Sequence, residues 1–229
     1  MQNFDIVRTS TVPNTFRNKA VIGMFDLPDG VQNERFVGSM DLPPNWKIGC
    51  IVGNSGTGKT TIAKHLFPNE CVTEFKFDDK KSVLDCMPKP LTVQQITETF
   101  NAVGFSSPPS WLKPYSVLSN GQKMRTDLAF ALMQDKPTIV FDEFTSVVDR
   151  TVAQVGSLAV QKAIRRTSRK FVAVTCHFDV IPWLMPDWVF DTNDMTFHVI
   201  GEKKNPKLES KYSRQRISQF GVCLQNTTI

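Results

Sequence analysis

The stretch Gly53-Asn-Ser-Gly-Thr-Gly-Lys59-Thr60 decides the fold expected of this chain. It matches the phosphate-binding pattern GxxxxGK(S/T), and it lies between an apolar strand predicted over 47–52 and a helix predicted over 60–66. Glycines let such a loop turn its N–H groups around phosphates, while Lys59 adds a positive charge and Thr60 offers a hydroxyl to magnesium. The residues expected to bind a nucleoside triphosphate are Gly53, Asn54, Ser55, Gly56, Thr57, Gly58, Lys59, Thr60 and Thr61.

Two carboxylates follow a second apolar strand, predicted over 138–141. Asp142 comes directly after this strand and is the expected partner of Thr60 at a magnesium ion. Glu143 is one residue further and is expected to orient an attacking water. Ligands of open α/β sheets collect at the carboxyl ends of strands, so both acids are expected near the glycine loop.

The remaining periodicity predicts strands and helices in alternation, and therefore a mostly parallel sheet with helices on its faces. Thr92 and Gln95 have the spacing of a capping box for a helix that Gly104 ends, and an amphipathic helix is predicted over 120–134. A further helix is expected over 152–166, a strand over 171–175 and another strand over 188–190. Residues 1–45 indicate antiparallel strands, among them Lys19 to Phe25, interrupted by prolines and glycines.

A third motif makes the resemblance specific, because Leu118-Ser-Asn-Gly-Gln122 resembles the LSGGQ signature of the ABC ATPase family. This resemblance implies a P-loop NTPase of the ABC ATPase fold: a mostly parallel core sheet, an N-terminal antiparallel β region and a small helical subdomain. It also implies that two copies pack head to tail, so that the signature residues of one copy close on the ATP and Mg²⁺ held by the other. Those signature residues are Ser119, Asn120, Gly121 and Gln122, with Asn120 in place of the usual glycine.

Two more stretches match the family in order. Ser146-Val-Val-Asp149 resembles its D-loop, which implies that Asp149 lies at the boundary between the two copies. His177 resembles its switch histidine, which implies a γ-phosphate contact and a catalytic role beside Glu143 and Lys59.

The sequence departs from the family at two points. No glutamine occurs between Thr61 and Val93, so the glutamine loop has no counterpart; Asp85 could replace it, although an ordinary turn carboxylate is the simpler interpretation. The aromatic side chain that stacks on adenine is assigned to Phe25, with Phe16 and Phe36 as alternatives and core packing as the competing explanation for all three.

Several stretches, including Asp142 to Arg150 and Pro186 to Phe190, are similar to a soluble ABC subgroup found fused to GNAT-type acetyltransferases. We therefore expect a cytoplasmic ATP hydrolase that forms a homodimer on ATP binding and acts on a partner protein or nucleic acid, with no membrane insertion. An acetyltransferase would have to be a separate chain. The alternatives are the ATP-binding subunit of a transporter, which the short segment between Lys59 and Leu118 disfavours, and a P-loop kinase of a small substrate, which leaves the signature unexplained.

Composition agrees with a globular protein: 229 residues, 41% apolar and 21% charged, with five scattered cysteines that suggest no disulfide framework or zinc site. We expect one ATPase domain over 1–200, with the helical subdomain at about 88–135, and a basic tail over 201–229. The tail supplies much of the net charge of +5. A second basic group could bind nucleic acid or be an ordinary solvated face; it consists of Lys162, Arg165, Arg166, Arg169 and Lys170.

Overall fold

A computed structural model of the chain describes residues 2–28, 30–72 and 75–200. The chain divides into two compact units, residues 1–41 and residues 42–229. The expected basic tail over 201–229 lies outside the described residues. Among those that are described, no helix combines the length and apolar character needed to span a bilayer.

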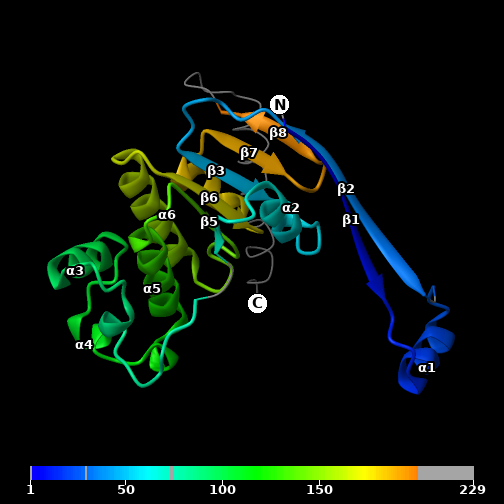
Figure 1. Cartoon of the computed structure of the whole chain (residues 1–229), viewed down its shortest axis with the longest axis horizontal. Helices are drawn as coiled ribbons and strands as arrows, with labels where there is room; N and C mark the ends of the chain where they lie inside the picture. The colour runs from blue at the N-terminus through cyan, green and yellow to red at the C-terminus, as the bar shows by residue number, and fades with distance from the viewer. Residues whose placement is uncertain (1, 29, 73–74, 201–229) are drawn as a thin grey trace, which may run out of the picture. The chain divides into compact units, whose positions relative to one another are not determined.

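The first unit is a two-stranded antiparallel ribbon, as the sequence indicated. Strands β1 (Gln2–Thr11) and β2 (Val31–Met40) pair along their whole length, from Gln2 opposite Met40 to Thr11 opposite Val31. The helix α1 (Phe16–Phe25) connects them (Figure 1).

The prediction of a β-like piece over Lys19 to Phe25 is wrong, because these residues belong to α1. Thr15 caps the helix by accepting a hydrogen bond from the backbone N–H of Asn18 at 3.2 Å. At the other end, Asp26 takes a left-handed conformation and Leu27 donates to the carbonyl of Ile22. Local capping thus overrides the apolar composition, and α1 buries none of its side chains.

The second unit is built on a six-stranded sheet with the order β4-β5-β6-β3-β7-β8. All neighbouring pairs are parallel except β7 and β8. The mostly parallel core sheet is therefore confirmed. Its strands are β3 (Ile48–Val52), β4 (Cys71–Val72), β5 (Thr138–Phe141), β6 (Lys170–Thr175), β7 (Trp188–Asp191) and β8 (Thr196–Val199).

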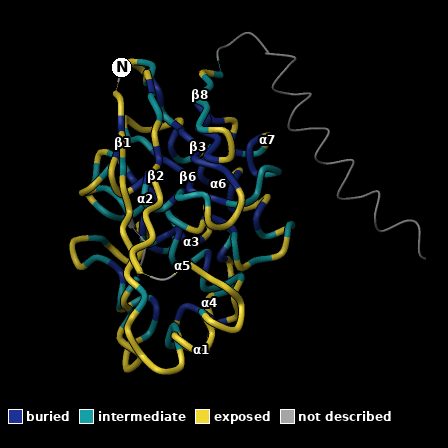
Figure 2. The backbone as a smooth tube through the Cα atoms, turned by 90° about the vertical axis from the view of Figure 1, so that its right-hand side faces the viewer, coloured by how far each residue is buried: buried dark blue, intermediate teal, exposed yellow. Residues whose placement is uncertain are grey.

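Helices connect and cover the strands. The long helices α5 and α6 carry buried apolar side chains that join one core cluster with alternate residues of β3, β5 and β6. The helix α2 contacts β3 and β6. Burial is accordingly concentrated on the central strands β3 and β6 (Figure 2). The helices are α2 (Lys59–Leu66), α3 (Val93–Ala102), α4 (Pro108–Trp111), α5 (Asn120–Met133), α6 (Arg150–Arg165) and α7 (Ile181–Leu184), with 3-10 turns η1 (Leu84–Cys86), η2 (Tyr115–Val117) and η3 (Phe178–Val180).

The helices α3, α4 and α5 form the small helical group that was expected (Figure 1). The capping box of Thr92 and Gln95 is present at the start of α3, and Gly104 follows its end with φ of 78°. Ile96 and Phe100 of α3 are buried, whereas Val93 is exposed. This group leads through α5 into β5, and so places the signature stretch one helix away from the carboxylates.

Candidate functional site

The carboxyl ends of four neighbouring strands meet at one edge of the sheet. Val52 at the end of β3 lies opposite Thr175 of β6 on one side and Asp191 of β7 on the other. Phe141 at the end of β5 lies opposite Ala173 of β6. The loops that follow these strands carry the phosphate loop, Asp142 with Glu143, His177, and Thr192 with Asn193. Parallel pairing therefore brings together residues far apart in the sequence.

The phosphate loop follows β3 and opens into α2, as predicted. Lys59 is only 8% exposed, and its Nζ donates to the carbonyl oxygen of Asn54 at 2.7 Å across the loop. Gly58 precedes α2 with φ of 85°, a left-handed conformation that suits glycine. The buried ammonium and the helix N-terminus both favour an anion in the loop.

The proposed magnesium pair is in contact. Thr60 Oγ1 at the start of α2 donates to Asp142 Oδ1 at the end of β5, at 3.2 Å. Magnesium takes hard oxygen ligands and is commonly bound by one or two protein side chains together with water and substrate phosphates. A hydroxyl and a carboxylate beside a phosphate loop therefore fit this ion.

Glu143 lies in a tight turn directly after Asp142. Its backbone is left-handed with φ of 53°, and its N–H donates to Asp142 Oδ1 at 3.0 Å. Ser146 Oγ donates to the Glu143 carboxylate at 2.6 Å, and the Ser146 N–H donates to the Glu143 carbonyl. The side chain is exposed at the sheet edge, so it can reach a water outside the loop while Ser146 fixes its direction.

His177 follows β6 and is held near the same turn. Its backbone N–H donates to Thr175 Oγ1 at 3.1 Å, and its side chain forms a hydrogen bond with the Ser146 backbone. Burial and the nearby Arg150 lower the pKa of His177 below its ordinary value, against opposing effects of Asp179, Ser146 and Glu143. The net effect favours the neutral imidazole.

The signature stretch starts α5. Ser119 and Gln122 form a capping box, in which the Ser119 hydroxyl accepts from the Gln122 N–H and the Gln122 side chain accepts from the Ser119 N–H. Gln122 Nε2 also donates to Ser110 Oγ at 3.0 Å, which makes Gln122 part of the support of the helical group. Ser119 and Asn120 are exposed at the N-terminus of a 14-residue helix. The N-terminus of α5 therefore lies on the surface of the chain.

The D-loop stretch continues from the Glu143 turn into α6. Asp149 caps this helix, with Oδ1 accepting from the N–H groups of Thr151 and Val152 at 2.9 and 3.0 Å. Val147 is 69% exposed in the same stretch. Asp149 thus has a local structural function, and its exposed position is compatible with the predicted boundary between copies.

The remaining predicted residues are placed as follows. Phe25 and Phe16 are exposed on α1, and Phe36 is buried on β2; all three belong to the first unit. Asp85 accepts a hydrogen bond from Ser82 Oγ at 2.5 Å within the turn that contains η1. Asp85 therefore behaves as a turn carboxylate, the simpler of its two interpretations.

An aromatic contact lies between β4 and the helical group, where a glutamine loop was sought. Phe77 stacks on Tyr115 with ring centroids 4.4 Å apart and contacts Phe130 of α5 edge to face. Phe75 packs against Phe141 at the end of β5. Aromatic packing thus connects the sheet to the helix of the signature at this point.

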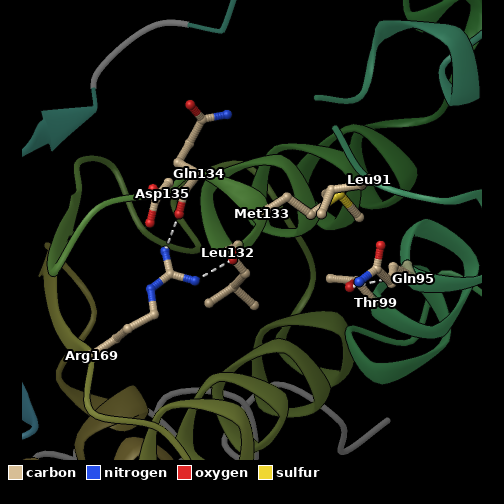
Figure 3. A pocket seen from close by; sticks show the side chains of 8 residues that line it. All are labelled: Leu91, Gln95, Thr99, Leu132, Met133, Gln134, Asp135 and Arg169. Atoms are coloured by element: carbon tan, nitrogen blue, oxygen red, sulfur yellow. Dashed lines mark hydrogen bonds between the residues drawn. The ribbon is translucent and has the colours of Figure 1, made fainter. Parts of the chain in front are cut away.

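The basic group before β6 is largely engaged within the fold. Arg165 pairs with Asp187 at 2.8 Å, and Lys170 lies over the Trp46 ring. Arg169 donates to the carbonyls of Leu132 and Gln134 at the end of α5, beside a hollow of about 370 Å³ that is also lined by residues of α3 (Figure 3). It also donates to the carbonyl of Lys136. Lys162, Arg165 and Arg166 are exposed, whereas Arg169 and Lys170 are half-buried. The helix α6 ends at Arg165, so the five residues do not form one basic face along it.

Two residues of the site were not predicted. Thr192 and Asn193 follow β7 and touch the phosphate loop: Asn193 Oδ1 accepts from the Asn54 N–H at 3.0 Å, and Thr192 Oγ1 lies 2.5 Å from Thr57 Oγ1. The available signal was the polar stretch Asp191-Thr-Asn after a strand of the parallel sheet. Its position at the correct edge depends on the pairing of β7 with β3.

Comparison with solved structures decides the fold. The dimeric structure of a bacterial ABC transporter cassette aligns with a TM-score of 0.56 and 16% identity, covering 69% of this chain and 87% of the other. A post-hydrolysis state of an ATP-binding cassette bound to ADP and Pi gives 0.59 and 14%, covering 73% and 93%. The chain has the fold of an ATP-binding cassette.

One more solved structure has a similar fold, and one known protein is similar in sequence. A bacterial Atm1-family ABC exporter with ATP bound aligns with a TM-score of 0.57 and 15% identity, over 86% of this chain and 39% of the other. The NU+ prion formation protein 1 of Saccharomyces cerevisiae is 30% identical over 152 residues, which are 66% of this chain. The match spans only 12% of that relative's length. No family model matches the chain.

Proposed function

We propose that this chain is an ABC-type ATPase that binds ATP with Mg²⁺, dimerises head to tail and hydrolyses ATP. One observation carries the proposal: the buried Lys59, the Thr60 and Asp142 pair, and the turn that holds Glu143 beside His177 all lie at the same sheet edge. This set supplies a phosphate cradle, hard oxygen ligands and a carboxylate outside the cradle. Its order along the chain and the cassette fold support the same assignment.

The chemistry follows from charge and position. Lys59 leaves the Asn54 carbonyl for a phosphate oxygen, where its charge offsets the negative charge that the phosphates bring. Thr60 and Asp142 would hold Mg²⁺, which when bound neutralises phosphate charge and fixes the phosphates in place. Glu143 orients a water in line with the terminal phosphate, while His177 can donate its ring N–H to a γ-phosphate oxygen in place of the Ser146 backbone.

Dimerisation supplies the remaining side of the site. Ser119 and Asn120 are exposed at the start of α5, and their own chain already has α2 to serve its phosphate loop. An exposed helix N-terminus with a serine cap suits an anion held by a second copy. Closure of two copies on ATP, and release after hydrolysis, would drive or time a change in a partner protein or nucleic acid. Association with an acetyltransferase on a separate chain is the narrower form of this proposal.

Phosphate release tests the proposed reaction. The wild-type chain is expected to release inorganic phosphate from ATP in the presence of Mg²⁺, and Lys59→Ala to release none. Glu143→Gln is expected to retain ATP binding while kcat falls by about 10²-fold or more. Glu98→Gln, which alters an exposed carboxylate on α3, serves as the matched control and should match the wild type. Equal rates for wild type and Glu143→Gln would refute the assignment of Glu143.

A second candidate is the ATP-binding subunit of a membrane transporter, because two of the similar structures are an ABC transporter cassette and an ABC exporter. This role needs a separate membrane protein that holds the chain at a bilayer. Co-sedimentation with membranes in an ATP-dependent manner would favour the transporter role. Recovery with a soluble complex would favour the first proposal.

A further inference from the structure

The turn between β7 and β8 makes direct contact with the phosphate loop. The Thr192 N–H donates to the Val52 carbonyl at 2.7 Å and so extends the pairing of β3 and β7 by one residue. Thr192 is only 2% exposed. The next residue, Asn193, accepts the Asn54 N–H with its side chain at 3.0 Å. The first residues of the loop are thus fixed by a segment that is remote in sequence.

The Thr192 side chain also lies against Gly53. A Cβ built at Gly53 would be 2.1 Å from Thr192 Oγ1 and 2.9 Å from Thr57 Oγ1. Gly53 has φ of 154°, a conformation that residues with side chains rarely adopt. The absence of a side chain at position 53 is therefore what allows the two threonine hydroxyls to meet.

The two hydroxyls form a short relay. Thr192 Oγ1 is 3.1 Å from the Val52 carbonyl, Thr57 Oγ1 is 2.8 Å from the Asn54 carbonyl, and the two hydroxyl oxygens are 2.5 Å apart. Each threonine hydroxyl has one proton, so only two of these three contacts can be hydrogen bonds donated by the hydroxyls at any one time. Because two oxygens at 2.5 Å require a proton between them, either Thr57 donates to Thr192 or Thr192 donates to Thr57. In the second arrangement Thr57 is free to donate to Asn54.

This relay bears on Lys59. In the described structure Lys59 Nζ donates to the same Asn54 carbonyl. When Lys59 moves to a phosphate, that carbonyl loses a donor, and a polar group left without a partner is costly. The Thr57 N–H keeps only a long contact with the Asn54 carbonyl, at 3.4 Å. Donation from the Thr57 hydroxyl at 2.8 Å, supported by Thr192, is the shorter contact that keeps this carbonyl paired. The relay therefore lowers the cost of moving Lys59, and the fixed loop loses less freedom when the ligand binds.

We propose that Thr192 and Asn193 are positioning residues of the phosphate loop, which hold it in the shape that binds the phosphates of ATP or ADP and allow Lys59 to move to them. This inference rests on the proposed nucleotide binding. Neither residue contacts the reacting atoms. Their effect is on nucleotide affinity, with kcat unchanged.

The test is calorimetric titration of the whole chain with Mg-ATP and with Mg-ADP. Thr192→Val keeps the shape and removes the hydroxyl, so Kd for both nucleotides should rise by about three- to tenfold, the effect of about one hydrogen bond. Thr192→Ser keeps the hydroxyl and should restore affinity. Thr196→Val removes a hydroxyl from β8 in the same hairpin and is the matched control, with unchanged affinity expected.

Asn193→Ala provides a second route at an exposed position, where folding is not at risk. It should also raise Kd, and both variants should raise KM while kcat stays the same. If the wild-type chain binds Mg-ATP and Kd is unchanged in both Thr192→Val and Asn193→Ala, this inference is overturned while the proposed function stands. Equal losses of nucleotide affinity in Thr192→Val and Thr192→Ser would also overturn it. If the wild-type chain binds no Mg-ATP, the proposed function fails and the inference fails with it.

Discussion

Replacing Asp127 with asparagine should change how the stability of the chain depends on pH. Asp127 lies on α5, five residues after the signature stretch, and Tyr115 Oη donates to its Oδ2 at 2.8 Å. Its Oδ1 is buried and makes no hydrogen bond to any residue that the structure describes. Burial raises the pKa of Asp127 from 3.8 to about 7, although Tyr115 and Lys123 act in the opposite direction.

The sign follows from linkage. The folded chain favours the neutral carboxyl, so this stabilising contribution is fully present below about pH 4 and is lost as the pH rises to about 7. Each pKa unit corresponds to 1.36 kcal/mol, so a rise from 3.8 to about 7 corresponds to about 4 kcal/mol. Because the side chain is partly exposed, we halve this value, and the expected loss of folding free energy is about 2 kcal/mol. Asparagine stays neutral and keeps an acceptor for Tyr115. Asp127→Asn should therefore be close to wild type at pH 4 and more stable by about 2 kcal/mol at pH 8.

Thermal unfolding followed by circular dichroism at both pH values measures this difference. For a domain of this size, 2 kcal/mol corresponds to a Tm increase of about 4–8 °C at pH 8. Glu98→Gln neutralises an exposed carboxylate on α3 and should show no such pH-dependent gain. A Tm change in Asp127→Asn that is the same at pH 4 and pH 8, or a loss at pH 8, would refute the reasoning.

Two further variants test separate parts of the account. Lys59→Ala should abolish measurable Mg-ATP binding in calorimetry, because it removes the one buried cation described in the phosphate loop; unchanged affinity would contradict this. Arg169→Gln should lower the free energy of unfolding by about 2 kcal/mol, since Arg169 caps two carbonyls at the end of α5 and donates to that of Lys136, whereas Arg166→Gln at an exposed position should have little effect. Equal Tm values for these two arginine variants would show that the cap is unimportant.

Much of the site could be predicted because its parts are local in sequence. The strand, glycine loop and helix around Lys59 follow one another within a few residues, and Asp142 comes directly after an apolar strand. The rule that parallel strands end at one edge was then sufficient to predict the contact of Thr60 with Asp142. The mostly parallel sheet followed from the same alternation of strands and helices.

The parts that were missed depend on contacts between distant segments. Thr192 reaches the phosphate loop only because β7 pairs with β3, and a sequence pattern does not specify that strand order. Arg169 has the spacing of a helical basic face, but α6 ends at Arg165 and the guanidinium turns to α5. The helix over Lys19 to Phe25 was missed because its apolar residues do not form the one-sided pattern of a buried helix. What fixes it instead is a local cap at Thr15.

Light scattering of Glu143→Gln after size exclusion tests most directly the claim that two copies share each ATP. With saturating ATP and Mg²⁺, the account predicts a particle of twice the chain mass of 25.8 kDa, and a monomer when nucleotide is omitted. The double variant with Lys59→Ala should stay monomeric under both conditions. A Glu143→Gln monomer with bound Mg-ATP would contradict the shared site.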